Sequence, residues 1–267
     1  YVNGNAYGTT KKSVEEARAR GKNVILDVDT IGAMKIRALC PDATLVYILP
    51  PSWDELKSRL SSTGIYNKEE VNALMEIAEE EISCANSYDY ILVNDTISNT
   101  LSRFAQIIHH EAVGHGFGYL GDEYDDVYDG EIPSNVMAEL KEIADRYGWY
   151  SNIDFTPDIT KVKWNYFITD KRYVNERLGA WEGAYGYRSG VWRPTNISIM
   201  LYNVGGFNAP CREAIYRRVM KLAGESYSRD KFLEYDAVNR KSALKRMNAG
   251  SVDRNHFIPL ASPVIID

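Results

Sequence analysis

Histidine is rare in this chain, and its placement indicates metal chemistry. Only four histidines occur in 267 residues, and three of them, His109, His110 and His115, fall within seven positions. Glu111 follows His110 directly, which gives the pattern H-E-x-x-x-H. Zinc hydrolases use two imidazoles on one helical face as ligands and a nearby carboxylate as the base that activates the metal-bound water. The residue types therefore predict one zinc ion held by His110 and His115, with Glu111 as general base.

The spacing of the two histidines requires a distorted helix. Residues four apart on an α-helix differ by about 40° around the axis, whereas residues five apart, like His110 and His115, differ by about 140°. One extra residue absorbed as a π-bulge would restore the common face, and Gly114 lowers the steric cost of that distortion. Two helical histidines could also form a solvated face. We favour the metal site because Ile107 and Ile108 predict a buried helix.

The segment that contains and follows these histidines has further motifs in a recognisable order. They are residues 110–124, 187–195, 198–200, 207–215 and 234–240. With them, residues 109–267 resemble the IgA-peptidase-like zinc metallopeptidases of the metzincin group. The resemblance implies a zinc-dependent endopeptidase with a peptide or protein substrate.

The same resemblance implies further site residues. Asp122 would be the third ligand, since aspartate replaces the third histidine in some metzincins. It lies seven residues past His115, where the metzincin spacing is six, so Glu123 remains an alternative. Met200 would belong to the methionine turn beneath the metal, and Tyr202 would stabilise a developing oxyanion.

Another set of motifs occupies the first part of the chain. They lie at residues 7–9, 26–29, 48–52 and 88–95. With them, residues 1 to about 108 resemble guanylate kinase. The resemblance implies a P-loop type of α/β fold, with Tyr7 and Thr9 at the GMP phosphate and Asp29 near the guanine.

This first part departs from the kinase pattern in two places. The phosphate-cradling motif G-x-x-x-x-G-K-[ST] has no counterpart in the sequence, and of the lid arginines only Arg59 is found. Phosphoryl transfer depends almost entirely on positioning and charge stabilisation. We therefore expect no kinase activity. The alternative to a zinc peptidase is a non-catalytic remnant or chimera with a guanylate-kinase-like nucleotide-binding fold.

The predicted elements give an α/β fold, α+β overall. Strands are expected at 24–29, 43–49 and 91–93, alternating with helices at 12–20, 53–60 and 69–85, which is typical of a mostly parallel sheet. After residue 108 we expect a loop-rich half with helices at 109–119, 133–147 and 210–222. The two predicted domains, 1–108 and 109–267, meet inside one helix at 98–119.

Composition excludes some partners. A net charge of −6 without a basic cluster argues against nucleic acid. No apolar stretch approaches the ~18 residues of a membrane span, so no membrane partner is expected. Three scattered cysteines form no disulfide framework. The peptidase resemblance favours a secreted or surface protein and the kinase resemblance a cytoplasmic one, so localisation and oligomeric state stay open.

Overall fold

The computed structural model describes residues 8–203 and 205–241, and its contacts divide the chain into two compact units, residues 1–43 and 44–267. Among the described residues, no helix is both long and apolar enough to cross a bilayer. In the described residues, the first unit contains helices and the second contains both helices and strands, so the coarse α/β prediction is confirmed. A metzincin-like second half is not shown.

The first unit contains two short helices with side-chain caps. Helix α1 (Lys11–Ala19) begins at Thr10, whose hydroxyl accepts a hydrogen bond from the Ser13 amide at 3.2 Å. Helix α2 (Thr30–Leu39) begins at Asp29, whose Oδ1 accepts from the Gly32 amide at 2.6 Å. Such caps satisfy amide groups that the first helical turn leaves without partners.

The predicted strand at 24–29 is wrong. These residues carry no strand assignment, and the Ile25 side chain is 71% exposed. A strand needs a neighbour for its backbone N–H and C=O groups. None of the strand pairs among the described residues includes this segment.

The second unit begins with a parallel pair of strands. Strand β1 (Val46–Leu49) pairs with β2 (Tyr90–Val93) in the register Val46 to Tyr90. The crossover between them contains α3 (Trp53–Ser62), α4 (Lys68–Ser83) and a short 3₁₀ turn, η1 (Ala85–Ser87). The Asp89 carboxylate accepts from the Leu45 amide at 2.6 Å and fixes the start of the pair.

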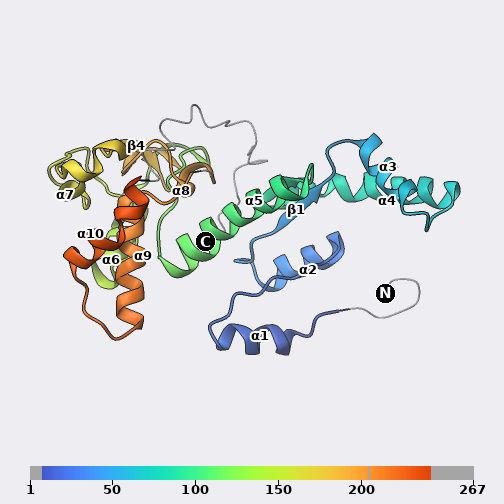
Figure 1. Cartoon of the computed structure of the whole chain (residues 1–267), viewed down its shortest axis with the longest axis horizontal. Helices are drawn as coiled ribbons and strands as arrows, with labels where there is room; N and C mark the ends of the chain where they lie inside the picture. Colours follow the sequence, from blue (N-terminus) through green and yellow to red (C-terminus); the bar gives the residue numbers. More distant parts are fainter. Residues whose placement is uncertain (1–7, 204, 242–267) are drawn as a thin grey trace. The chain divides into compact units, whose positions relative to one another are not determined.

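Helix α5 (Ile97–Ile108) follows β2 and continues directly into a π-helix, η2 (His109–Phe117) (Figure 1). Arg103 joins α5 to the end of β2, because it donates to the Val93 carbonyl and the Asp95 carboxylate, both at 3.2 Å. The domain boundary predicted at residue 108 lies within this continuous helix.

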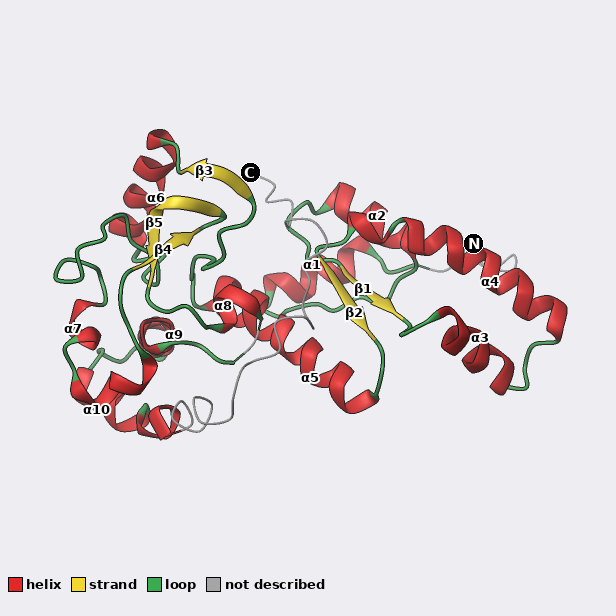
Figure 2. Ribbon diagram, turned by 90° about the horizontal axis from the view of Figure 1, so that it is seen from above, coloured by secondary structure: helices red, strands yellow, loops and turns green. Residues whose placement is uncertain are grey.

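The second unit also contains a three-stranded sheet. Strand β5 (Tyr187–Arg193) lies between β3 (Tyr128–Glu131), which is parallel to it, and β4 (Trp181–Ala184), which is antiparallel. Helix α6 (Ser134–Tyr147) packs beside this sheet (Figure 2). Their common core consists of Ile132, Leu140, Ile153, Ala184 and Val191. These short strands lie in stretches whose lack of periodicity had predicted loops.

The remaining helices enclose an aromatic core. They are α7 (Asn165–Ile168), the 3₁₀ helix η3 (Lys171–Glu176), α8 (Ile199–Tyr202), α9 (Ala209–Leu222) and α10 (Arg229–Tyr235). Trp164, Phe167, Tyr173 and Phe232 are buried together here. A separate small core of Leu120, Ile199, Met200 and Cys211 lies against the π-helix.

Candidate metal centre

The π-helix brings the two histidines together. Its nine residues include His110 and His115, and the hydrogen bond from the Gly118 amide to the Val113 carbonyl, at 2.8 Å, spans five residues. An i to i+5 pattern places residues five apart on the same face. The Nε2 atoms of His110 and His115 lie 3.1 Å apart as a result. The distortion expected from the spacing is therefore present, as a whole π-helical segment and not as a single bulge.

Gly114 allows the turn of α8 to approach this helix closely. A Cβ atom at Gly114 would overlap the Met200 sulfur and would lie 3.0 Å from its terminal methyl. Met200 is fully buried, so it has little room to give way. The preceding carbonyl, that of Ile199, lies 2.7 Å from His110 Nδ1. The segment from Ser198 to Met200 thus packs against η2 and orients the His110 ring.

His110, His115 and Asp122 form a triad of possible metal ligands. Asp122 Oδ1 lies 3.0 Å from the Nε2 atom of each histidine, and the three ligand atoms all lie within 4.8 Å of one another. His115 Nδ1 lies 2.8 Å from the Leu120 carbonyl. Because carbonyls only accept, both Nδ1 atoms act as donors, and both Nε2 atoms face Asp122. The triad can hold a metal ion.

The charges of the triad residues favour the binding of a metal ion. Burial lowers the pKa of His115, but the carboxylates of Asp122 and Glu111 and the hydrogen bond to the Leu120 carbonyl together outweigh burial and raise this pKa to about 10. Burial raises the pKa of Asp122, and the two histidines outweigh that effect and hold it well below its usual range. The metal-free triad therefore carries a proton that a metal ion would displace.

Glu123 has a separate environment. It is fully buried, and its backbone amide donates to the Met200 carbonyl at 2.8 Å. Its carboxylate accepts hydrogen bonds from four side chains, those of Asn152, Ser198, Asn208 and Cys211. Burial raises the pKa of Glu123, and these donors partly offset the rise. The contacts favour Asp122 over Glu123 as the ligand.

Two tyrosines that sequence reasoning missed lie beside the triad. The Tyr90 hydroxyl donates to Glu111 Oε1. The Tyr124 hydroxyl is hydrogen-bonded to Asp122, and its ring stacks on that of His110 with centroids 6.4 Å apart. Both stood in quoted motifs, Tyr124 in 110–124 and Tyr90 in 88–95, but neither was expected to have a role at the metal site.

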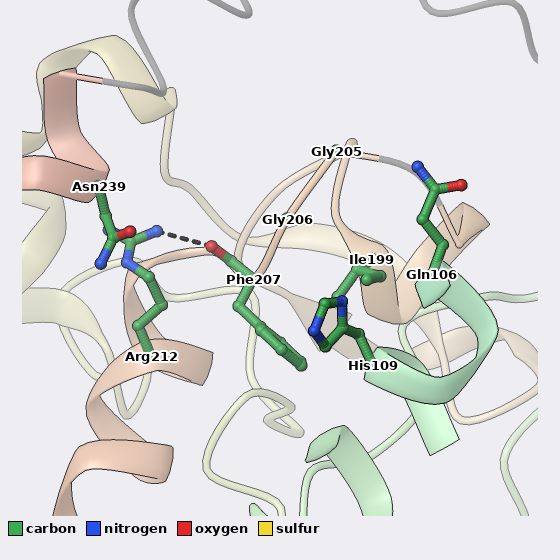
Figure 3. Close-up of a pocket in the computed structure, with 8 residues that line it drawn as sticks. All are labelled: Gln106, His109, Ile199, Gly205, Gly206, Phe207, Arg212 and Asn239. Carbon is green, nitrogen blue, oxygen red and sulfur yellow. Dashed lines mark hydrogen bonds between the residues drawn. The ribbon is translucent and has the colours of Figure 1, made fainter. Parts of the chain in front are cut away.

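Other expected residues lie outside the triad. Tyr202 ends α8 and is 37% exposed. His109 is exposed and lines a pocket of about 270 Å³ with Phe207 and Arg212, which donates to the Phe207 carbonyl at 2.6 Å (Figure 3). None of the triad side chains is among the described residues that line this pocket.

The residues expected to bind nucleotide lie in the first unit. Thr9 is exposed, Asp29 caps α2, and Tyr7 lies outside the described residues. In the second unit, Arg59 donates to Glu55 Oε1 at 2.7 Å.

The first part of the chain is similar to known guanylate kinases. The guanylate kinase family profile matches residues 1–111. The chain is 46% identical over 103 residues to guanylate kinase of Francisella tularensis subsp. tularensis, covering 38% of this chain and 54% of that protein. Guanylate kinase of Thermus thermophilus is 35% identical over 146 residues, covering 54% of this chain and 64% of that protein. The chain spans about half the length of the first of these relatives.

These matches correct the function expected from the sequence. They point to a nucleotide kinase, and they overturn the zinc metallopeptidase, its endopeptidase activity and its peptide or protein substrate. The expectation that kinase activity is absent is contradicted by the same relatives. The resemblance of residues 1–108 to guanylate kinase is confirmed; that of 109–267 to the IgA-peptidase-like family is not supported.

Proposed function

We propose that this chain acts on guanine nucleotides as a guanylate kinase, with GMP as acceptor and ATP as donor of a phosphoryl group. The observation that carries the proposal is the 46% identity over 103 residues to a guanylate kinase. An oxygen of the GMP phosphate would attack the γ-phosphorus of ATP, and ADP would leave, which yields GDP. Magnesium carried by ATP would neutralise charge on the phosphates during this transfer.

A direct assay tests the proposed reaction. The full chain with ATP and magnesium should form GDP from GMP, and it should leave AMP unchanged. Tyr7→Phe should lower the rate, because the family resemblance places this hydroxyl at the GMP phosphate. If the full chain neither forms GDP nor binds GMP detectably by calorimetry, the proposal is wrong.

Asp29 provides a sharper test of nucleotide binding. Guanine presents N–H donors on its Watson–Crick edge, and a carboxylate can accept from them. Asp29→Asn should weaken GMP binding about 10-fold or more, because a hydrogen bond to a charged group contributes roughly 1.5–3 kcal/mol. Helix α2 should remain, since asparagine caps a helix as well as aspartate does. Calorimetric titration with GMP measures the effect.

The matched control separates recognition from capping. Asp29→Ala removes both the carboxylate and the cap of α2. It should weaken GMP binding and also lower the helical circular dichroism signal. Equal GMP affinity in the parent and in Asp29→Asn would remove Asp29 from the binding site.

We further propose that His110, His115 and Asp122 bind a divalent transition-metal ion such as zinc. The support is the convergence of two imidazole nitrogens and one carboxylate oxygen within 4.8 Å, which is a ligand set typical of zinc. Two carbonyls orient the imidazoles, as outer partners of metal sites do. Three protein ligands leave one coordination position of a tetrahedral ion open. Elemental analysis of protein purified without added metal should find about one ion per chain.

A further inference from the structure

Glu111 lies beside the triad without being part of it. It directly follows His110 in the π-helix, and its negative charge is close enough to His115 to contribute to the raised pKa of that imidazole. Its carboxylate oxygens are nevertheless absent from the group of described ligand atoms that lie within 4.8 Å of one another. A carboxylate this near to a metal would compete for an open position unless something held it.

Tyr90 is the residue that holds the Glu111 carboxylate. The Tyr90 hydroxyl donates to Glu111 Oε1 and accepts a hydrogen bond from the Asn203 side chain, which directly follows α8. A phenol has one proton, so the donor on Asn203 leaves that proton for Glu111. Burial, and then the Glu111 carboxylate, raise the pKa of Tyr90, so the phenol stays protonated.

The backbone of Tyr90 is fixed as well. Tyr90 is the first residue of β2 and pairs with Val46 of β1. Its amide donates to the Leu45 carbonyl at 3.1 Å, and Leu45 in turn donates to the Asp89 carboxylate. Because these hydrogen bonds fix the backbone of Tyr90, its side chain can hold the Glu111 carboxylate in one orientation.

The two carboxylates near the triad therefore have separate phenol partners. Tyr124 is hydrogen-bonded to Asp122, which faces both histidines, and Tyr90 is hydrogen-bonded to Glu111, which does not join them. What distinguishes them is position: Asp122 Oδ1 lies 3.0 Å from both histidine Nε2 atoms, whereas the Glu111 oxygens lie outside the described group of ligand atoms.

We propose that Tyr90 is a positioning residue of the metal centre: it holds Glu111 out of the coordination shell and so keeps one metal position open for a small oxygen-donor ligand. The inference rests on the proposed metal site at His110, His115 and Asp122. It assigns Tyr90, which lies in the segment matched by guanylate kinases, to a centre formed largely by later residues.

Cobalt-substituted protein and acetohydroxamate, a small oxygen donor, test this role. Tyr90→Phe should still bind one Co²⁺, because no ligand is removed. It should bind acetohydroxamate about 10-fold more weakly, as judged by the visible cobalt spectrum, because Glu111 is then free to take the open position. Asn203→Gly, which suits the positive φ at this residue, should cause a smaller loss in the same direction. Tyr47→Phe in the neighbouring strand is the control and should change nothing.

The double variant identifies Glu111 as the cause. In a Glu111→Gln background, Tyr90→Phe should change acetohydroxamate affinity less than about 2-fold, since an amide is a poor competitor for the metal. An equal loss in both backgrounds, or no loss in either, would overturn the positioning role while cobalt still binds. Failure of the parent protein to bind cobalt would instead overturn the metal centre itself.

Discussion

Replacing either His110 or His115 with alanine should remove most of the metal affinity. Structural zinc sites bind with about 10–16 kcal/mol from four ligands, so the loss of one ligand should weaken binding roughly 10²–10³-fold. Each histidine directs its Nε2 atom toward Asp122 and is held at Nδ1 by a carbonyl, so both imidazoles are oriented for the same ion. Competition titration with a chromophoric chelator measures the affinities.

His109→Ala is the matched control for this experiment. His109 precedes the first ligand in the same π-helix, but it is exposed and lines the pocket with Phe207. Its removal should leave the metal affinity within about 2-fold of the parent value. If His109→Ala abolishes metal binding and His110→Ala does not, His110 and His115 are not the pair of histidines that binds the metal.

Glu123→Ala should destabilise the protein even without metal. Its carboxylate accepts from four buried side chains, and each buried donor that loses its partner costs about 1–3 kcal/mol. With water filling part of the space, we expect a loss of about 3–5 kcal/mol in the free energy of unfolding. Denaturant unfolding in the presence of a chelator measures this loss.

Asp122→Asn distinguishes a ligand from a structural carboxylate. It should abolish the difference in stability between zinc-loaded and chelated protein, because that difference arises only from metal bound to the folded state. Glu123→Gln, which keeps one acceptor oxygen, should lose less stability than Glu123→Ala and should retain the zinc-dependent difference. If Glu123→Ala is as stable as the parent in chelator but no longer binds zinc, then Glu123 is the ligand.

Local sequence determined most of the helices. Two strands, β1 and β2, and five helices, α1, α3, α4, α6 and α9, lie within a few residues of the predicted positions. Apolar periodicity and cap residues act over one or two turns, so a single sequence carries them. The strand predicted at 24–29 failed because strand formation depends on a partner that the local pattern does not specify.

The convergence of His110 and His115 was predictable for the same reason, and the surroundings of the two histidines were not. Five residues separate His110 from His115, and helical geometry alone required the π-helical distortion that the structure contains. The choice between Asp122 and Glu123 could not be made from adjacent positions in the chain. It depends on Asn152, Ser198 and Asn208, whose side chains donate hydrogen bonds to Glu123. Asp122 instead lies next to the two histidines. Tyr90 reaches Glu111 from 21 residues earlier in the chain, because the parallel pairing of β1 with β2 sets where β2 begins. Contacts of this kind depend on packing between distant segments, and only the tertiary structure decides them.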